Sequence, residues 1–163
     1  MHLSSIVMNR LLLIISIILL CTCSLEAQKK RVLILHSYHQ GLHWTDNTSK
    51  GILSVLGLKK NIDLQFDYLD TKRNPSKHYF ELLSQLYYQK LESRSFDAII
   101  TVDNNALSFV KQNQKKLFPD IPVIFCGVNN YIPEMIHGMD NVTGITEKTD
   151  FSTTMETMIQ LEK

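Results

Sequence analysis

Polar and aromatic side chains suited to holding a small molecule gather in three short segments of this 163-residue chain, each directly after an apolar run. The segments are residues 37–46, 103–105 and 127–131. They combine hydroxyl, amide, carboxylate and aromatic groups, and a small-molecule site uses such a mixture to orient its ligand. The residues that we expect to contact a ligand are Ser37, Tyr38, Trp44, Asp46, Asp103, Asn104 and Asn129.

Some of these residues also have a structural interpretation. Trp44 precedes an amphipathic run and can pack on its first turn as a hydrophobic staple. Asp46 and Asp103 can each cap a helix, because a carboxylate accepts hydrogen bonds from the free N–H groups at a helix start. Ser37 differs from them, since its small hydroxyl can hydrogen-bond a ligand without blocking it. The ligand-binding and the structural interpretation of Trp44, Asp46 and Asp103 both stay open at this point.

Three histidines, His36, His39 and His43, lie close to Asp46 in the first segment, and imidazole and carboxylate groups are ligands for zinc or copper. Their spacing does not put two of them on one helix face, and we expect His36 to point into the sheet. We therefore expect no metal and no cofactor. The chain also lacks the G-x-S-x-G, G-x-x-x-x-G-K-[ST] and G-x-G-x-x-G motifs, so we expect a binding protein and no catalysis.

Short apolar runs alternate with longer amphipathic ones, a pattern typical of an α/β fold in which helices cover a parallel sheet. The run at 62–70 alternates apolar and polar residues, which favours a place near the sheet edge. We expect the strands beginning at 31, 96 and 121 to be neighbours, so that the three polar segments lie side by side where these strands end. The expected strands are 31–36, 62–70, 96–102, 121–126 and a short piece at 141–145. The expected helices start at Thr45 or Asp46, at Ser76, at Asp103 or Asn104, near Pro133 and at Asp150.

Residues 1–27 are predicted to form a secretory signal peptide. One basic residue, Arg10, precedes the uncharged apolar run 11–20, and Ala27 suits the last position before cleavage. The run is shorter than the roughly 20 residues that span a bilayer. An uncleaved membrane anchor and a lipid attached at Cys21 or Cys23 are the alternatives. We therefore expect a periplasmic or otherwise extracytoplasmic protein, either free or tethered to the membrane.

Residues 28–163 are predicted to be one domain. The chain holds 17 basic and 16 acidic residues, scattered along it, which gives no electrostatic basis for nucleic-acid binding. Of its three cysteines only Cys126 follows the leader, so an internal disulfide is excluded there. A lone cysteine at the end of an apolar strand is most simply a small buried hydrophobe, with a reactive thiol as the alternative.

The segment from Val32 to Asp46 resembles the opening of the ABC-transporter substrate-binding-protein-like domains, which often serve as extracytoplasmic sensors of bacterial histidine kinases and diguanylate cyclases. Residues 96–106, 121–129 and 141–147 are similar to the successive landmarks of that family. The resemblance implies a type I periplasmic-binding-protein fold, in which two Rossmann-like lobes close on a small ligand. Residues 28–163 would then be the first lobe, a three-layer αβα unit with a mostly parallel sheet, truncated before the second lobe.

The resemblance implies an extracytoplasmic solute-binding module, either the substrate-binding component of an ABC transporter or the sensor input domain of a signalling protein, as in two-component signalling. The implied partners are a small-molecule ligand, the second lobe that this chain lacks, and a transporter permease or a fused signalling domain. Ligand binding would favour the closed state of the two lobes over the open one. The alternatives are an exported α/β enzyme whose histidine-rich loop is the active site, and an inert exported fragment.

Overall fold

A computed structural model describes residues 28–92, 94–147 and 151–161 of the chain. The predicted signal peptide lies outside the described residues. The strands are β1 (Lys30–His36), β2 (Ile62–Tyr68), β3 (Ala98–Val102), β4 (Val123–Val128) and β5 (Val142–Thr146). The helices are α2 (His43–Leu56), α3 (Lys77–Leu91), α4 (Asn104–Leu117), the short 3-10 helix η2 (Pro133–Met135) and α5 (Phe151–Leu161).

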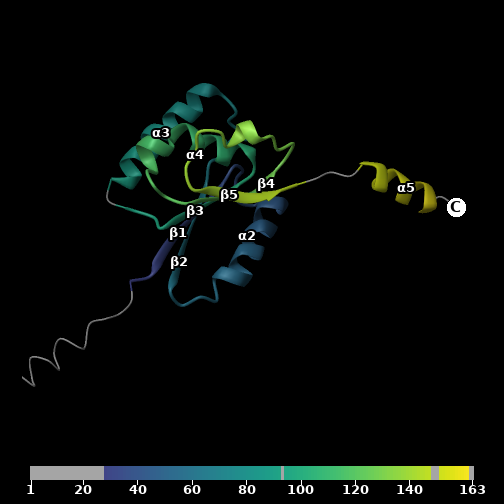
Figure 1. Cartoon of the computed structure of the whole chain (residues 1–163), viewed down its shortest axis with the longest axis horizontal. Helices are drawn as coiled ribbons and strands as arrows, with labels where there is room; N and C mark the ends of the chain where they lie inside the picture. Colours follow the sequence, from purple (N-terminus) through teal and green to yellow (C-terminus); the bar gives the residue numbers. More distant parts are fainter. Residues whose placement is uncertain (1–27, 93, 148–150, 162–163) are drawn as a thin grey trace, which may run out of the picture.

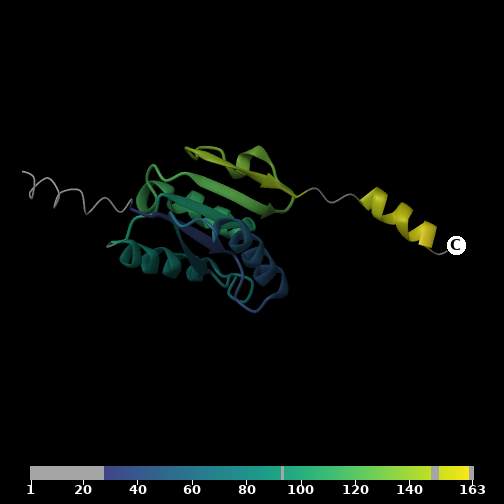
Figure 2. The same ribbon diagram turned by 90° about the horizontal axis from the view of Figure 1, so that it is seen from below.

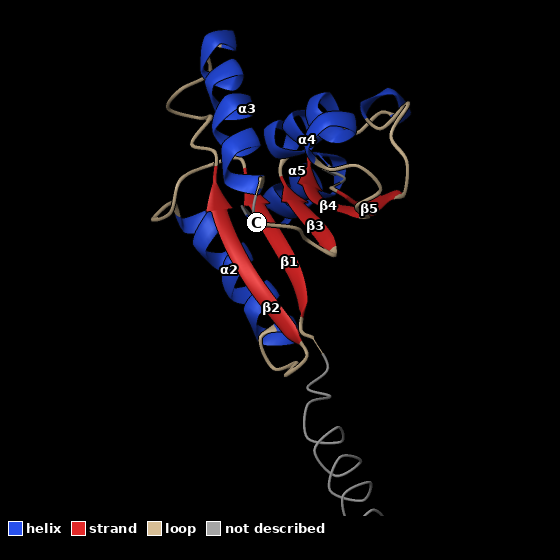
Figure 3. Cartoon of the chain, turned by 90° about the vertical axis from the view of Figure 1, so that its left-hand side faces the viewer, coloured by secondary structure: helices blue, strands red, loops and turns tan. Residues whose placement is uncertain are grey.

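The five strands form one sheet in the order β2-β1-β3-β4-β5, and every neighbouring pair is parallel. The α/β class and the three-layer Rossmann-like lobe expected from the sequence are therefore confirmed. The alternating strand β2 lies at the sheet edge, as its wetter pattern predicts. β1, β3 and β4 are adjacent, so the segments that follow them leave the sheet at the same edge (Figure 3).

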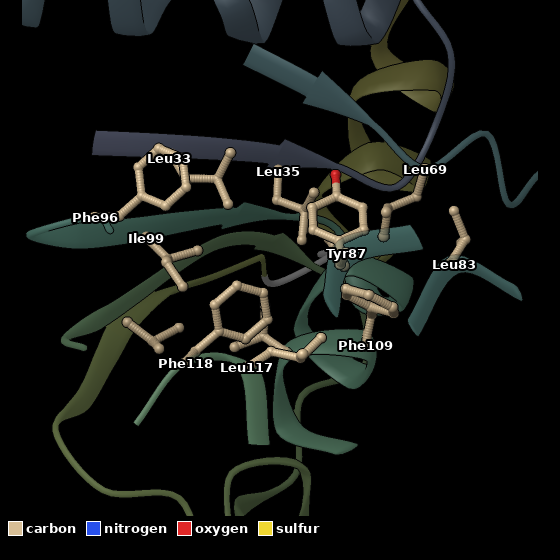
Figure 4. Close-up of a cluster of buried hydrophobic side chains, with 13 residues drawn as sticks. Leu33, Leu35, Leu69, Leu83, Tyr87, Phe96, Ile99, Phe109, Leu117 and Phe118 are labelled. Carbon is tan, nitrogen blue, oxygen red and sulfur yellow. The ribbon is translucent and has the colours of Figure 1, made fainter. Parts of the chain in front are cut away.

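The apolar runs are nearly continuous because the middle of the sheet is covered on both faces. Leu33 and Leu35 of β1 belong to a core shared with α3 and α4, whereas Val32 and Ile34 belong to a second core shared with α2. Figure 1 shows α3 and α4 on one side of the sheet and α2 on the other. The larger core is the one on the α3 and α4 side (Figure 4). Its aromatic members are Tyr87, Phe96, Phe109 and Phe118.

Two helices begin with side-chain caps, and the cap at Asp103 is the one that the sequence predicts. The Ser76 hydroxyl accepts a hydrogen bond from the Tyr79 N–H at the start of α3, and the Asp103 carboxylate accepts one from the Asn105 N–H at the start of α4. The predicted cap of α2 is wrong. That helix begins at His43 after Leu42, and no side chain caps it. The Asp46 carboxylate instead accepts a hydrogen bond from the Gly41 N–H in the preceding turn.

β4 extends further than predicted. Gly127 does not begin the loop after β4, because the strand continues to Val128. The Asp103 N–H donates to the Cys126 carbonyl at 2.9 Å, and this bond prolongs the contact between the β3 and β4 segments. After a register shift between Phe125 and Val128, Val128 pairs with Thr146 of β5, and this pairing extends β4 to Val128.

β5 and α5 complete the described chain. A Cβ atom at Gly144 would lie 2.4 Å from the Phe125 ring, so only glycine lets β5 pair closely with β4 at this point. α5 follows β5 and stands clear of the sheet, with all of its residues exposed (Figure 2). Within the described residues, no helix combines the length and apolar character needed to cross a membrane.

Candidate functional site

The candidate site lies at the edge of the sheet where β1, β3 and β4 end. Parallel strands bring the loops after their carboxyl ends to one edge, and open α/β sheets bind ligands there. The segment after β1 leads into α2, the segment after β3 is the start of α4, and the segment after β4 is residues 129–132. The three predicted polar segments therefore meet at this edge.

Tyr38 joins two of these segments. Its hydroxyl donates a hydrogen bond of 3.0 Å to the Asp103 carboxylate. Its ring meets the Trp44 ring edge to face, with the ring centroids 6.0 Å apart. Burial, and then the hydrogen bond from Tyr38 to Asp103 and the negative charge of that residue, raise the pKa of Tyr38 to about 12. The phenol is therefore protonated at neutral pH and acts as a fixed donor to Asp103.

Asp103 has an unusual backbone conformation. Its φ and ψ angles are 77° and 167°, a region that residues with a Cβ atom rarely adopt and that costs of the order of 1–3 kcal/mol. Four groups hold it there: its N–H bonds the Cys126 carbonyl, its own carbonyl accepts from Leu107, and its carboxylate accepts from Tyr38 and Asn105. Strain that the surrounding bonds maintain in this way is concentrated at functional sites.

Trp44 packs directly over the Gly127 backbone. A Cβ atom at Gly127 would lie 2.8 Å from two atoms of the Trp44 ring, and the φ angle of Gly127 is 65°. Both the close approach and the positive φ require glycine. Trp44 is half-buried, with its other contacts to Tyr38 and to the core on the α2 side. The indole therefore has a defined position and still keeps an exposed part.

Asn104 and Asn129 join the start of α4 to the segment after β4. The Asn104 side chain donates to the Asn129 carbonyl at 3.0 Å and accepts from the Asn129 N–H at 2.9 Å. Both bonds use the Asn129 backbone, so the Asn129 side chain takes no part in them, and the residue is exposed. These two hydrogen bonds hold the third polar segment against the start of α4.

Ser37 and Asp46 lie apart from this group. Ser37 is fully buried, and its hydroxyl donates to the Val102 carbonyl at 3.0 Å and accepts from the Ala106 N–H at 2.8 Å. The hydroxyl thus joins β1 to the first turn of α4, a structural role. Asp46 holds the turn at Gly41 through its carboxylate. Tyr38, Trp44, Asp103, Asn104 and Asn129 are the predicted residues that the fold brings together.

The loop between β2 and α3 also reaches this edge, and the sequence reasoning missed it. The Lys72 ammonium group lies 5.3 Å from the centre of the Tyr38 ring. Thr71 donates to the Ser37 carbonyl and accepts from the Asn105 side chain. Since β2 is parallel to β1 and pairs with it, the polar residues directly after β2 were the signal that could have placed this loop at the site.

The three histidines do not act together. His36 is fully buried and its Nε2 atom lies 3.0 Å from the Ser49 hydroxyl. His39 faces the Asp70 carboxylate at 3.4 Å, and His43 bonds Asn47. In the described part of the chain, no group of three or more His, Cys, Asp or Glu residues has the geometry of a metal site.

Ser49 and His36 have the side chains of a nucleophile and a base, but the hydrogen bond between them runs in the wrong direction for proton abstraction. The Ser49 hydroxyl donates its hydrogen to the Thr45 carbonyl, so its oxygen accepts from the Nε2–H of His36. The imidazole therefore carries no lone pair toward the hydroxyl proton. Both residues are buried, which keeps a substrate away from them.

Of two pockets in the described structure, one lies near this edge and the other lies at the opposite edge of the sheet. One lies beside the start of α4 and is lined by residues of α4 and η2, among them Asn104, Lys111 and Met135. The other lies at the opposite edge of the sheet, among Lys30, Arg31 and Asp97. There the Asp97 carboxylate already pairs with the Lys30 ammonium group and the Arg31 N–H. We place the site at the edge with the aromatic and strained residues.

Comparison with known proteins supports the fold alone. No family model and no curated protein matches the sequence. Among solved structures, the chain is similar to the ABC domain from Streptococcus pneumonia in complex with L-Trp, with a TM-score of 0.51 and 16% sequence identity over 73% of this chain. The match covers 39% of that chain. The coarse fold of a periplasmic-binding-protein-like lobe is therefore supported, and the similar protein binds a small molecule.

Proposed function

We propose that this chain is a small-molecule binding lobe of an extracytoplasmic solute-binding module, whose ligand lies against the edge formed by Tyr38, Trp44 and Asp103. The observation that carries the proposal is the junction of these three residues, in which the carboxylate of Asp103, a residue with a strained backbone, is held beside an oriented phenol and a half-exposed indole. A ligand site needs a few fixed polar groups next to an apolar surface, and this junction supplies both.

The start of α2 adds a second recognition element. No side chain caps this helix, so the N–H groups of its first turn, at His43 and Trp44, are free of the usual side-chain partner. The positive end of a helix dipole favours an anionic group. In contrast, the first turn of α4 has its N–H groups bonded by Asp103 and Ser37. We propose a ligand with a carboxylate directed at α2 and a flat apolar group against Trp44.

In the larger protein to which we assign this lobe, a second lobe closes the site. Binding would stabilise the closed arrangement, and a transporter permease or a fused signalling domain would respond to that state. Both roles use the same ligand contacts. With the proposed export through the leader, the protein would bind its ligand in the periplasm or otherwise outside the cytoplasm.

Three related compounds test the proposal by isothermal titration calorimetry. L-tryptophan has both features, tryptamine lacks the carboxylate, and glycine lacks the ring. We expect L-tryptophan to bind and the other two to bind at least about tenfold more weakly, which corresponds to roughly 1.4 kcal/mol. The Trp44→Leu variant should lose most of this binding, whereas His137→Ala, which changes an exposed residue outside the site, should retain it. Equal heats for all three compounds would contradict the proposal.

An exported α/β enzyme is not favoured by any specific contact of the described residues. The pair of Ser49 and His36, which lie close together, has its hydrogen bonds in the wrong direction for proton abstraction and is buried. We therefore propose binding without chemical conversion of the ligand.

A further inference from the structure

Lys72, in the loop after β2, brings an unpaired positive charge to the candidate site. The residue is exposed, and its ammonium group contacts the Tyr38 ring, 5.3 Å from the ring centre. The neighbouring basic side chains differ, because the Arg73 guanidinium donates to the Asp70 carboxylate at 2.7 Å and His39 faces the same carboxylate. Within the described residues no carboxylate pairs with Lys72, so its charge is available to a ligand.

The backbone next to Lys72 is fixed by hydrogen bonds to two other elements. The Thr71 N–H and the Thr71 hydroxyl both donate to the Ser37 carbonyl after β1, at 2.8 and 2.7 Å. The same hydroxyl accepts from the Asn105 side chain at the start of α4, at 2.9 Å. Thr71 is 1% exposed. The loop therefore holds the Lys72 backbone at the edge of the sheet and leaves the Lys72 side chain exposed.

The Tyr38 ring attracts the ammonium group but does not bind it strongly. The face of an aromatic ring is negative and attracts a cation within about 6 Å. The Tyr38 hydroxyl donates to the Asp103 carboxylate, and this bond polarises the phenol and makes its ring more negative. An exposed cation–π contact is nevertheless weaker than a charge-assisted hydrogen bond between an ammonium group and a carboxylate. An anionic group of a ligand can therefore draw Lys72 away from the ring.

We propose that Lys72 donates to the ligand carboxylate and restricts this site to anionic ligands, an inference that rests on the proposed function. A lysine ammonium group only donates hydrogen bonds, and its full charge favours an ionised carboxylate over a neutral carbonyl oxygen. The Asp103 carboxylate at the same junction repels an anion. A positive charge beside Tyr38 offsets this repulsion, because it lies on the same ring that bonds Asp103.

The start of α2 does not impose this restriction by itself. Free N–H groups at a helix start carry only about half a positive charge, and they also bond neutral carbonyl oxygens. Lys72 and Trp44, the second residue of α2, both contact the Tyr38 ring. A ligand whose ring lies against the Trp44 indole is therefore beside the Lys72 ammonium group, and Lys72 can select for the charge of that ligand.

Calorimetric titration of the full chain with L-tryptophan and L-tryptophanamide tests this role. The amide keeps the ring and the ammonium group but has a neutral carbonyl in place of the carboxylate. We expect the parent to prefer L-tryptophan by at least about tenfold, and Lys72→Gln to bind L-tryptophan about tenfold more weakly with its affinity for the amide within about twofold of the parent. Lys72→Arg, which keeps the charge, should keep the preference. The matched control Lys77→Gln removes one charge from the exposed start of α3 and should bind as the parent does.

The outcomes separate the role of Lys72 from the proposed ligand site. A preference for L-tryptophan that is unchanged in Lys72→Gln, or an equal loss of affinity for both compounds, would overturn the role of Lys72 alone. The same loss in Lys77→Gln would show a general effect of net charge and would also overturn it. If the parent does not bind L-tryptophan, the proposed ligand site fails and the role of Lys72 fails with it. Added salt should weaken L-tryptophan binding more in the parent than in Lys72→Gln, and an equal effect in both would contradict a direct charge contact.

Discussion

His36 should make the fold sensitive to mild acid, because its imidazole is buried in a place that accepts only the neutral form. The ring is fully buried and stacks on Tyr68, with the ring centroids 5.2 Å apart. Its Nε2–H donates to the Ser49 hydroxyl, while Nδ1 has no hydrogen-bond partner within the described residues. Protonation would therefore bury a charge and an N–H group without an acceptor. Burial lowers the pKa of His36 to about 4, although the nearby Asp46 charge acts in the opposite direction.

The magnitude follows from the difference between the folded and unfolded pKa values. The unfolded chain takes up the proton near the ordinary value of 6.5, before the folded chain does, so stability decreases as the pH falls from there toward 4. One pKa unit corresponds to about 1.4 kcal/mol, so the full difference corresponds to about 3 kcal/mol. Between about pH 7 and about pH 5 the expected loss is about 2 kcal/mol.

Urea denaturation of the purified protein, followed by circular dichroism at both pH values, measures this loss. The His36→Phe variant keeps an aromatic ring beside Tyr68 and cannot titrate, so carboxylates and the other histidines affect it and the parent alike. We expect the parent to lose about 2 kcal/mol more than the variant between the two pH values. An identical pH dependence in both proteins would show that protonation of His36 does not destabilise the fold.

Three further substitutions and one control, Gly51→Ala, test the packing of the sheet and the charge interaction at the site. Ser37→Ala should reduce the free energy of unfolding by about 1–3 kcal/mol, because the Ala106 N–H would lose its buried acceptor; chemical denaturation measures this, and an unchanged midpoint would contradict the role of the hydroxyl. Gly144→Ala should cost about 1–3 kcal/mol because its Cβ would overlap the Phe125 ring, whereas Gly51→Ala, in open space on a helix, should be neutral or stabilising by up to about 1 kcal/mol. Asp103→Asn should lower the pKa of Tyr38 from about 12, as measured by the ultraviolet absorbance of the phenolate; an unchanged titration would exclude the contribution of the Asp103 charge.

The sheet could be predicted from the sequence because its signals are local. The apolar run of β1 and the alternation in β2 each reflect how many faces of a strand are covered. These patterns therefore predicted the α/β class of the fold and the position of β2 at the sheet edge. The helix start at Ser76 and the cap at Asp103 were also predictable, because each of these side chains bonds an N–H only two or three residues away.

The predictions that failed depend on contacts between segments that are distant in the sequence, or on a choice between nearby groups. The Asp46 carboxylate could bond either the free N–H groups at the start of α2 or the N–H of the preceding turn. The sequence does not show that it bonds the Gly41 N–H, because this depends on the turn in which Gly41 has a φ of 91°. The extension of β4 to Val128 depends on the pairing of Val128 with Thr146 of β5. The contact of Lys72 with Tyr38 requires the pairing of β1 and β2.

For the candidate site residues, the sequence correctly predicted that the three polar segments meet at one edge of the sheet, but it could not separate exposed groups from buried ones. Ser37 has the residue type of a ligand contact, yet its hydroxyl is used between β1 and α4. The strain at Asp103 and the packing of Trp44 over Gly127 arise only when β3 and β4 are adjacent. The ligand contacts themselves stay predictions.

Trp44 is the only tryptophan of the chain, so the indole N–H signal in a ¹⁵N-correlated NMR spectrum reports on the candidate site alone. Titration with unlabelled L-tryptophan, which gives no signal of its own, shows whether a ligand binds beside this indole. We expect a saturable shift of this signal together with the backbone signals of Asp103 and Asn129, and no saturable shift with glycine. A Trp44 signal that stays unchanged throughout the titration, or that moves equally with glycine, would contradict this expectation.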